Sequence, residues 1–550
     1  MTCPVCLQQC DQPASLDPCG HTMCKTCADQ WVETCRPGPA TCPVCRASIA
    51  RLTNPEELAR SKTALSRNIS QFHEWCASEQ GPDSKQHQIE GVTWCLKHEV
   101  HPPPQFANVC GGLICDEMGL GKTILSLGLI ISNFKTRTLV VLPPVLIPQW
   151  VDALRRFCGH TPLVFHGPTR HAISKDDLEH APIVLTSYHM LAAPFKKRRH
   201  PTSQEPGSEP GSEPETKILT PLHALEWDRV ILDEAHHLRN QNTLFRGVQA
   251  LRYAIIWMVT GTPVHNKEKD LDAYWLLLGL PRNTISQLYT SARSTLRLLI
   301  RQHVLRRTKD EVGIHLPDLT QEVVEVQWQD EFERDFAEQL HSQLAFSGHV
   351  RNRVSGATSF LTSNTLPALV RCRQACVRPA LMDPHIQFYK DYTGDLEIEQ
   401  APSTSAKLAA VVDTVVRRRH CGRKLIFCTY HGEIDLLARL LTNHGFSVRS
   451  IDGRVPTPTR MQYINHDLPD VLLTQIISGS EGLNLQKYSD LYVVSPHWNP
   501  SIDDQAIARA HRIGQSLHVH VSRFIISHHL TSIDAYAQRI QLRKRRLRPF

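Results

Sequence analysis

The sequence lacks the features that direct a chain into or across a membrane. No apolar run in its 550 residues approaches the roughly 18 residues that a membrane-spanning helix needs. The N-terminus also lacks the charged segment and apolar stretch of a secretory signal peptide, and cysteines occupy it instead. We therefore expect a protein that is neither secreted nor membrane-bound and has no membrane partner.

A strong excess of one charge is also missing. The net charge is +7, from 61 basic and 54 acidic residues. Such a mild excess permits a phosphate backbone as a partner without demonstrating one. A hydrophobic content of 41% can fill the cores of three or four domains, the number that 550 residues suggest. The composition indicates a multidomain globular protein.

The most informative stretch of the sequence is 113–123, Leu-Ile-Cys-Asp-Glu-Met-Gly-Leu-Gly-Lys-Thr. It is typical of a triphosphate-binding loop that opens a helix, here over 124–131. Backbone N–H groups of such a loop face the phosphates, Lys122 reaches the β- and γ-phosphates, and Thr123 offers its hydroxyl to Mg²⁺. Asp116 stands where the usual G-x-x-x-x-G-K-[ST] pattern has its first glycine. By itself, the motif leaves a nucleotide site and a chance match about equally open.

An apolar strand about 110 residues further along ends in two carboxylates, Asp233 and Glu234. In a nucleotide site, Asp233 would hold Mg²⁺ and Glu234 would polarise the attacking water. An isolated Asp-Glu pair is more often a solvated turn, but further motifs of a nucleotide site follow in this sequence. Arg509 and Arg512 lie three residues apart on one expected helical face, and an arginine at a γ-phosphate accelerates transfer by roughly 10³ or more. We therefore predict a catalytic site.

Eight motifs follow one another along the chain: Gln88, DEMGLGKT, LDEAHH, TGTP, LRRTK, SGSEGLNL, HWNP and QAIARAHRIGQ. Together they resemble the SWI/SNF-type ATPases of helicase superfamily two, over residues 84 to about 530. The resemblance implies two RecA-like lobes with ATP between them, and it explains Asp116, because DEMGLGKT is the family's own spelling. The ATP contacts that it implies are Gln88, Asp116, Glu117, Met118, Gly119, Leu120, Gly121, Lys122, Thr123 and Gln505.

The same resemblance implies contacts with DNA. Matching motifs place these contacts on Gln149, Trp150, Thr186, Ser187, Tyr188, Ser478, Gly479 and Asn484. Segments of this kind hold the phosphate backbone and carry no base readout. The expected partner is therefore double-stranded DNA of any sequence.

Nine of the 18 cysteines lie within the first 45 residues, mostly in closely spaced pairs. With one histidine they supply eight soft ligands, enough for two tetrahedral zinc sites: Cys3, Cys6, Cys19, His21, Cys24, Cys27, Cys42 and Cys45. A disulfide framework is the alternative, but it suits small secreted chains. Cys10 and Cys35 are left over as surplus thiols.

The order of these ligands resembles a RING finger. The resemblance implies that Cys3, Cys6, Cys24 and Cys27 bind one ion, whereas Cys19, His21, Cys42 and Cys45 bind the other. It also implies a surface for a ubiquitin-conjugating enzyme and ubiquitin, at Val5, Trp31, Pro43 and Arg46. Alternatively, Val5 and Trp31 only pack a domain that is too small to form a core without metal.

Short apolar runs alternate with helical stretches in both halves of the motor, which predicts an α/β fold with parallel sheets. The expected strands are 138–142, 183–186, 229–232 and 255–259, then 424–428, 448–451, 471–475, 491–494 and 519–524. The expected architecture is two RecA-like parallel-sheet lobes with helical insertions and a small zinc-bound RING domain. Its parts are a RING finger (1–50), a helical linker (51–80), lobe one (81–290, with a disordered insert at about 200–216), an interlobe linker with helical insertions (291–400), lobe two (401–535) and a basic tail (536–550).

The linker after the RING should be an amphipathic helix that begins near Pro55 and carries Leu65, Ile69, Phe72 and Trp75 on one side. We predict that it packs against the motor as a semi-rigid strut. A coiled-coil contact is the alternative.

These features predict an ATP-driven translocase on double-stranded DNA that carries a RING ubiquitin ligase, with ATP, Mg²⁺ and two Zn²⁺ as cofactors. Two alternatives stay open. One is a strand-separating DNA or RNA helicase, suggested by the letters DEAH at 233–236, and the other is a scaffold whose RING only binds partners. Basic runs at 196–199 and 543–548 favour the nucleus, with a cytoplasmic viral replication compartment as the alternative.

Overall fold

The computed structural model divides the chain into two compact units, Met1–Val264 with Glu268–Gly313, and His265–Lys267 with Ile314–Phe550. The residues that it describes are 2–10, 12–17, 19–35, 40–47, 49, 51–53, 55–79, 81–82, 85–100, 109–192, 220–264, 267–328, 330–342, 365–386, 400–476, 483–526 and 532–546. Among the helices of these ranges, none is both long and apolar enough to cross a membrane. The predicted insert at 200–216 lies outside the described residues.

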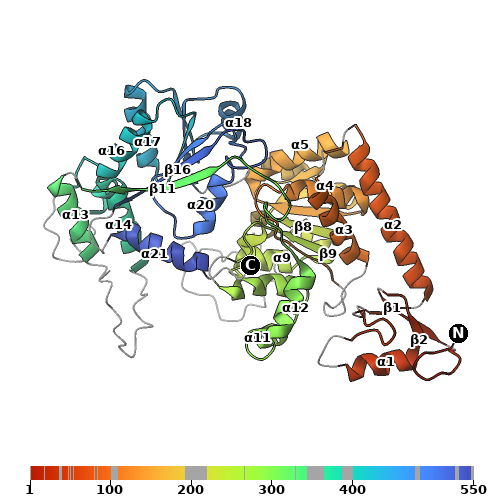
Figure 1. The fold of residues 1–550 in the computed structure, drawn as a ribbon. Helices are drawn as coiled ribbons and strands as arrows, with labels where there is room; N and C mark the ends of the chain where they lie inside the picture. Colours follow the sequence, from red (N-terminus) through yellow and green to blue (C-terminus); the bar gives the residue numbers. More distant parts are fainter. Residues whose placement is uncertain are drawn as a thin grey trace, which may run out of the picture. The chain divides into compact units, whose positions relative to one another are not determined.

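The N-terminal domain is built on three short strands, β1 (Pro13–Asp17), β2 (Thr22–Cys24) and β3 (Arg51–Thr53), with helix α1 (Lys25–Thr34) after β2 (Figure 1). The sheet order is β2-β1-β3, and both pairings are antiparallel. In the β1–β3 pairing Leu52 lies opposite the buried Leu16. A RING boundary at residue 50 therefore separates β3 from its sheet, and the strand pairing carries the domain to residue 53.

Helix α2 (Pro55–Ala77) leads from this domain into lobe one. Its Phe72 and Trp75 are buried in the lobe-one core, where Leu65 and Ile69 also pack. The indole of Trp75 donates to the carbonyl oxygen of Phe157 at 2.6 Å. Helix α2 thus packs against the motor, as the strut prediction requires.

Lobe one has a seven-stranded sheet whose pairings are all parallel, in the order β10-β4-β9-β8-β5-β7-β6. Its strands are β4 (Cys110–Ile114), β5 (Thr138–Leu142), β6 (Leu163–Phe165), β7 (Ile183–Ser187), β8 (Glu226–Asp233), β9 (Arg252–Val259) and β10 (Val304–Leu305). The helices of this lobe are α3 (Gln86–Val100), α4 (Lys122–Ser132), α5 (Ile147–Cys158), α6 (Lys175–His180), α7 (Tyr188–Ala192), α8 (Pro221–Ala224), α9 (Thr243–Gln249), α10 (Asp272–Leu277), α11 (Arg282–Leu288) and α12 (Arg293–His303). The four predicted strands are confirmed. Strand β10 joins the sheet from beyond the predicted lobe boundary at residue 290.

Lobe two has a six-stranded parallel sheet in the order β11-β16-β15-β12-β14-β13. Its strands are β11 (Leu319–Val326), β12 (Lys424–Cys428), β13 (Val448–Ile451), β14 (Val471–Gln475), β15 (Asp490–Val493) and β16 (Val519–Ile526). The helices are α13 (Glu331–Ser342), α14 (Thr365–Val377), α16 (Ala406–Arg417), α17 (His431–Asn443), α18 (Thr457–Asn465), α20 (Pro500–Ile507) and α21 (Ile533–Arg546). The five predicted strands of this lobe are confirmed, and α13 and α14 lie in the segment predicted to be helical.

Strand β11 lies within the segment that the sequence places between the lobes. It pairs with β16 along its whole length, with Leu319 opposite Val519 and Val326 opposite Ile526. Figure 1 shows green β11 beside blue β16. The predicted interlobe segment, 291–400, therefore supplies an edge strand to the lobe-two sheet.

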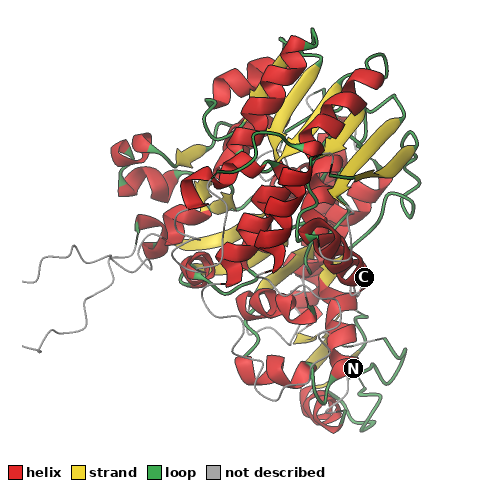
Figure 2. Ribbon diagram, turned by 90° about the vertical axis from the view of Figure 1, so that its left-hand side faces the viewer, coloured by secondary structure: helices red, strands yellow, loops and turns green. Residues whose placement is uncertain are grey.

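Burial explains why the central strands could be read from the sequence. All five residues of β5, Thr-Leu-Val-Val-Leu, are buried, and so are all five of β12. Parallel strands covered by helices on both faces read as continuous apolar runs, because neither face meets water. Figure 2 shows the strands in yellow flanked by helices in red. Because the strands are parallel, their carboxyl ends lie at one edge of each sheet. Ligands of open α/β folds bind at this edge.

A buried ion pair stabilises lobe one beneath this edge. Arg229 of β8 donates from Nε and Nη2 to the two carboxylate oxygens of Glu99 on α3, at 2.7 and 2.6 Å. Both side chains are fully buried. The indole of Trp257 on β9 donates to the same carboxylate at 2.9 Å. One carboxylate thus ties α3 to the two neighbouring central strands.

Candidate functional site

Three motifs meet at the carboxyl edge of the lobe-one sheet. Strands β4, β9 and β8 are neighbours in that order. The glycine-rich loop follows β4, Thr260 follows β9, and Asp233 ends β8. The backbone N–H of Thr260 donates to the carbonyl of Ile114 at 3.0 Å, which closes the edge between the first two motifs. Because ligands bind at this edge in parallel α/β sheets, the site is placed where a nucleotide is expected.

The glycine-rich loop is held by helix α3. Gly121 caps α4 with φ of 80°, and the side-chain amide of Gln88 donates to the carbonyl of Leu120 at 3.1 Å. The left-handed backbone favours glycine here, and a Cβ atom on Gly121 would lie 2.2 Å from that amide nitrogen and displace Gln88. Lys122 begins α4 and its ammonium donates to the carbonyl of Asp116 at 2.9 Å. The structure therefore brings the predicted residues Gln88, Gly121 and Lys122 together.

The two acidic residues of the loop have partners of their own. Arg307 forms an ion pair with Asp116, with Nη2 at 2.5 Å from Oδ2, and Asp116 is only 2% exposed. Lys309 forms an ion pair with Glu117 at 2.8 Å. These two carboxylates thus anchor the loop to the segment after β10, and their contact with ATP stays a prediction. The sequence analysis named the LRRTK motif but gave Arg307 and Lys309 no role. The only indication in the sequence was that their charge is opposite to that of Asp116 and Glu117.

The Asp233 carboxylate is fixed from two sides. Its Oδ2 accepts a hydrogen bond from the indole Nε1 of Trp150 on α5 at 2.8 Å, and its Oδ1 accepts from the backbone N–H of Glu234 at 3.0 Å. Burial, and next the neighbouring Glu234 carboxylate, raise the pKa of Asp233 to about 6, whereas the Trp150 hydrogen bond opposes this rise. The hydroxyl of Tyr188 donates to the backbone carbonyl of Asp233 at 2.7 Å. A cation bound at this carboxylate would favour its ionised form.

Four of the expected DNA contacts are buried residues, and their contact with DNA stays a prediction. The side chains of Trp150, Thr186, Ser187 and Tyr188 are at most 2% exposed. The hydroxyl of Thr186 donates to the carbonyl of Phe165 at 2.9 Å, so its bonding is internal. Two of the others bond to Asp233, because Trp150 donates to its carboxylate and Tyr188 donates to its backbone carbonyl. Gln149 and Asn484 are exposed and stay predicted contacts, whereas Ser478 and Gly479 lie outside the described residues.

Glu234 links the acidic pair to the TGTP motif. Its backbone is left-handed, with φ of 50°, which is strained for a residue with a Cβ. Its Oε2 lies 3.2 Å from Nδ1 of His236, and that nitrogen lies 3.3 Å from the Thr260 hydroxyl. A chain of polar contacts therefore runs from β8 to the end of β9. The role of Glu234 in orienting water stays a prediction.

The arginine motif lies in lobe two. Helix α20 ends at Ile507, so Arg509 and Arg512 occupy the turns that follow it, and the expected helical face is wrong. After the helix, the Arg509 carbonyl accepts from the backbone N–H of Leu485 at 3.0 Å. Burial, and next the Arg509 charge, lower the pKa of Arg512. Gln505 is buried on α20, and its contact with ATP stays a prediction.

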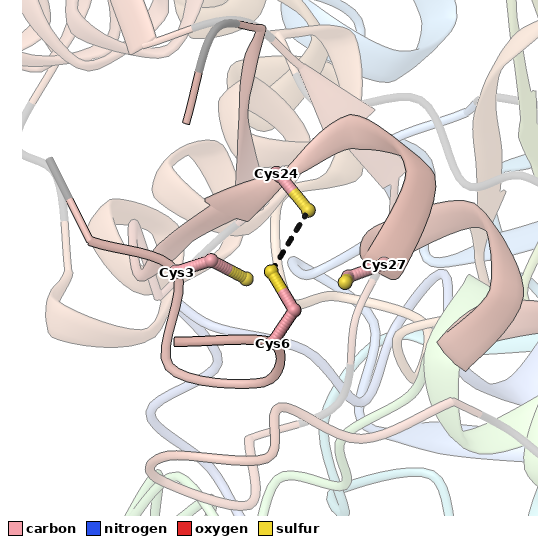
Figure 3. Close-up of side chains that lie close together, drawn as sticks. All are labelled: Cys3, Cys6, Cys24 and Cys27. Carbon is pink, nitrogen blue, oxygen red and sulfur yellow. Dashed lines mark hydrogen bonds between the residues drawn. The ribbon is translucent and has the colours of Figure 1, made fainter. Parts of the chain in front are cut away.

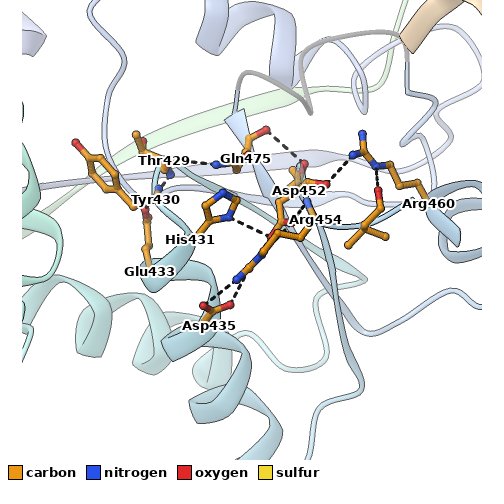
Figure 4. A network of polar contacts seen from close by, with 11 residues as sticks. Thr429, Tyr430, His431, Glu433, Asp435, Asp452, Arg454, Arg460 and Gln475 are labelled. Atoms are coloured by element: carbon orange, nitrogen blue, oxygen red, sulfur yellow. Dashed lines mark hydrogen bonds and ion pairs between the residues drawn. The ribbon is translucent and has the colours of Figure 1, made fainter. Parts of the chain in front are cut away.

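A polar network lies at the carboxyl edge of the lobe-two sheet (Figure 4). Arg454 lies between two carboxylates, with Nη2 at 2.7 Å from Asp452 and 2.8 Å from Asp435. Nδ1 of His431 lies 3.5 Å from Asp452, and Arg460 donates to the Asp452 carbonyl at 2.7 Å. The charges compensate one another inside the network. It therefore braces the ends of β12 and β13, and sequence reasoning did not find it.

The N-terminal cysteines form two groups of four ligands. In the first, Cys3, Cys6, Cys24 and Cys27 point toward one common centre (Figure 3), and their sulfur atoms lie within 4.8 Å of one another. The Sγ atoms of Cys6 and Cys24 are 3.8 Å apart. Tetrahedral zinc with bonds of about 2.3 Å requires sulfur atoms about 3.8 Å apart. This group therefore fits one zinc ion.

The second group consists of Cys19, His21, Cys42 and Cys45, again with ligand atoms within 4.8 Å. Sγ of Cys42 lies 3.6 Å from Nδ1 of His21. The two sets alternate along the sequence, as in a cross-brace, so the predicted ligand pairing is confirmed. Two four-ligand sites that fit two zinc ions are thus present.

Two copies of Cys-Pro-Val-Cys form matching turns in these sites. The backbone N–H of Leu7 donates to Cys3, and that of Arg46 donates to Cys42, at 3.0 and 2.8 Å. Leu7 and Arg46 both have left-handed backbones, with φ of 60° and 62°. A repeated tetrapeptide has therefore produced a repeated metal-binding turn.

The expected docking residues lie on or near the RING surface. Val5 is 41% exposed and Arg46 is exposed, whereas Trp31 and Pro43 are half-buried. The indole of Trp31 donates to the carbonyl of Thr41 at 2.8 Å, which joins α1 to the second ligand turn. Leu7 at 77% and Val44 at 52% add apolar surface that sequence reasoning missed. Their position next to the zinc-binding cysteines could have indicated that they are exposed.

Family comparisons agree with this arrangement. The family described as SNF2-related domain matches residues 87–381, the helicase conserved C-terminal domain matches 406–514, and the ring finger domain matches 1–46. The first match covers more than half of the chain. The chain therefore belongs to the SNF2-related family of ATPases, with a helicase C-terminal domain and an N-terminal RING finger. Membership implies ATP hydrolysis with Mg²⁺.

Among similar proteins, a probable global transactivator of Orgyia pseudotsugata multicapsid polyhedrosis virus is 28% identical, over 84% of this chain and 90% of the relative. The chromodomain-helicase-DNA-binding protein 8 of Xenopus tropicalis is 26% identical, over 86% of this chain but 22% of its own length. The DNA repair protein RAD5B of Arabidopsis thaliana is 23% identical, over 80% and 45%. The chain thus spans less than half of the two cellular relatives.

A solved structure described as the Sulfolobus solfataricus SWI2/SNF2 ATPase core in complex with dsDNA is also similar. It is 22% identical, with a TM-score of 0.36, and the match covers 80% of this chain and 87% of that one.

Proposed function

We propose that this protein is an ATP-driven translocase on double-stranded DNA whose RING recruits a ubiquitin-conjugating enzyme and promotes ubiquitin transfer. The observation that carries the proposal is the meeting of Lys122 with Asp233 at one sheet edge, in a chain that belongs to the SNF2-related family. The proposed catalytic roles are phosphate binding for Lys122, Mg²⁺ binding for Thr123 and Asp233, water orientation for Glu234, and γ-phosphate contact for Arg509 and Arg512.

We propose duplex DNA of any sequence as the substrate, because contacts with the phosphate backbone do not read the bases. The exposed side chains of Gln149 and Asn484 remain in place for such contacts. The names of two relatives, a chromodomain-helicase-DNA-binding protein and a DNA repair protein, support the same substrate. We propose that hydrolysis moves the protein along the duplex without separating the strands.

The RING proposal rests on the surface beside the two zinc sites. Val5, Leu7 and Val44 are exposed on the two ligand turns, Trp31 on α1 is half-buried, and the exposed Arg46 adds a positive charge next to Cys45. A half-buried aromatic anchor with an arginine nearby is typical of a protein interface. We therefore propose that this surface docks the conjugating enzyme and that Arg46 contacts ubiquitin.

We propose that the protein acts in the nucleus, where its DNA substrate would lie. The C-terminal basic run begins within helix α21, and Arg543 is exposed there. The alternative location that the sequence left open is a cytoplasmic viral replication compartment. A fluorescent fusion with and without the basic residues of α21 distinguishes the two.

The ATPase assay that tests the motor compares duplex DNA, single-stranded DNA and RNA as activators. We expect duplex DNA to stimulate most, with little dependence on its sequence, and we expect rising salt to weaken the stimulation steeply. Lys122→Ala should lose nucleotide binding, whereas Glu234→Gln should bind ATP without hydrolysing it. Stronger activation by RNA, or efficient unwinding of a blunt duplex, would replace the translocase with a strand-separating helicase.

The ligase is tested by polyubiquitin synthesis with a panel of conjugating enzymes. Val5→Ala and Arg46→Ala should lower synthesis while both zinc ions stay bound, because neither side chain is a ligand. Trp31→Ala should do the same. Loss of zinc together with activity would mean that these side chains only pack the domain, and an inactive unmutated RING would favour the scaffold.

A further inference from the structure

The hydrogen bond from Trp150 to Asp233 is a feature that DNA binding does not explain. Trp150 is 1% exposed, and its Nε1 lies 2.8 Å from Oδ2 of Asp233. An indole N–H is a donor and never an acceptor. It can therefore only donate to the Asp233 oxygen, and the bond fixes the orientation of that carboxyl group.

Three elements restrain Asp233 at the same time. Trp150 reaches it from α5, and Tyr188 reaches its backbone carbonyl from the start of α7. The third donor is the backbone N–H of Glu234, which binds the other carboxylate oxygen at 3.0 Å. Each carboxylate oxygen keeps a further lone pair for another partner. The carboxylate is thus orientated before any ligand arrives.

We propose that Trp150 is a positioning residue that presents the Asp233 carboxylate to the Mg²⁺ of the bound nucleotide, with Tyr188 supporting the backbone beneath it. This inference rests on the proposed role of Asp233 in holding Mg²⁺. Trp150 and Tyr188, which the sequence analysis expected to contact DNA, thereby receive a role in the nucleotide site. Hydrogen-bonded partners of a metal ligand typically change metal affinity by roughly 10–100-fold when they are removed.

Lobe one provides a matched control for this hydrogen bond. Trp227 is also 1% exposed, and its Nε1 donates to the carbonyl of Leu222 at 2.9 Å. Trp150→Phe and Trp227→Phe therefore remove the same atoms and one buried hydrogen bond each. Only the first bond ends on a carboxylate of the candidate site. A purely structural role for Trp150 predicts equal effects of the two variants.

The experiment measures binding of a non-hydrolysable ATP analogue to the full chain across a Mg²⁺ titration and in EDTA. For Trp150→Phe we expect the half-saturating Mg²⁺ concentration to rise roughly 10-fold, with unchanged binding in EDTA. Trp227→Phe should leave both unchanged. An unchanged Mg²⁺ requirement in Trp150→Phe, or an equal rise in both variants, would overturn the positioning role.

Asp233→Asn separates this inference from the proposed function. If Asp233→Asn removes the Mg²⁺ effect while Trp150→Phe does not, only the positioning role fails. If Asp233→Asn retains the Mg²⁺ effect, the assignment of the Mg²⁺ ligand itself fails. Should Trp150→Phe not fold, Tyr188→Phe removes a single hydroxyl, and a Mg²⁺ requirement like that of the unmodified chain would overturn the proposal.

Discussion

The RING and lobe one are stabilised by different means. The small buried core of the RING includes Cys3 and Cys42, which are two of its own metal ligands. The core of lobe one is built from aliphatic and aromatic side chains of several strands and helices, and a buried ion pair joins Arg229 to Glu99. A domain of about 50 residues buries too little apolar surface to fold by itself, whereas a lobe does not need a metal. Zinc should thus be essential for the folding of the RING and irrelevant to the stability of lobe one.

Removing zinc tests this difference with the largest expected effect. Zinc supplies about 10–16 kcal/mol in small metal-bound domains, so chelation should unfold the RING completely and leave the melting of the lobes unchanged. Cys24→Ser should lose zinc, and Cys35→Ser should keep two ions per chain, because Cys35 is not in a ligand group. Metal analysis with limited proteolysis measures both. If the RING stayed resistant to proteolysis in chelator, its folding would not depend on zinc, and the two regions would not differ in this respect.

The buried charges of lobe one should give the next largest effect. Glu99→Gln leaves the Arg229 charge buried without its carboxylate, which typically costs about 3–5 kcal/mol. The zinc content should not change. Glu226→Gln is the control, because Glu226 forms a 3.7 Å pair with Arg252 at the surface, where such pairs contribute about 0–1 kcal/mol. Denaturant unfolding of the lobes compares the two variants, and equal losses would contradict the role of burial.

Helix α2 belongs to the lobe in this comparison, and Gly128→Ala tests that assignment. An added Cβ would lie 2.6 Å from a ring carbon of Phe72, so α2 and α4 would have to move apart. Overpacking of this kind costs about 1–3 kcal/mol. We expect lobe one to melt earlier while both zinc ions stay bound. Gly453→Ala, where nothing lies within 4 Å, is the control. Zinc loss in Gly128→Ala would assign α2 to the RING.

A buried carboxyl group in lobe two should give the smallest effect. Burial raises the pKa of Glu333 to about 7 from an ordinary value of 4.5. The folded state therefore keeps a proton that the unfolded state loses, so this group's contribution to stability falls as pH rises from about 4.5 to 7. Glu333→Gln should flatten the pH dependence of the lobe-two melting temperature, by roughly 2–4 °C for each kcal/mol that this group contributes. The exposed Glu331 provides the control, Glu331→Gln, and identical pH profiles for both variants would contradict the prediction.

Much of the fold was readable from local patterns. The buried strands β5 and β12 are unbroken apolar runs, and the zinc ligands occur as short pairs whose spacing limits the geometry. Strand β11 was not readable, because it lies at the sheet edge and most of its side chains are at least partly exposed. Its sequence Leu-Thr-Gln-Glu-Val-Val-Glu-Val mixes charge with apolar residues, and its partner β16 lies about 200 residues away.

The same division applies to the candidate site. The sequence by itself determined that Lys122 opens a helix and that Asp233 ends a strand, because both depend on neighbouring residues. Only the tertiary structure decided that Arg307 pairs with Asp116 and that Trp150 turns inward to Asp233, since these contacts join segments 191 and 83 residues apart. Local periodicity and ligand spacing are encoded within a few residues, whereas the partner of a buried polar group depends on how distant segments pack together.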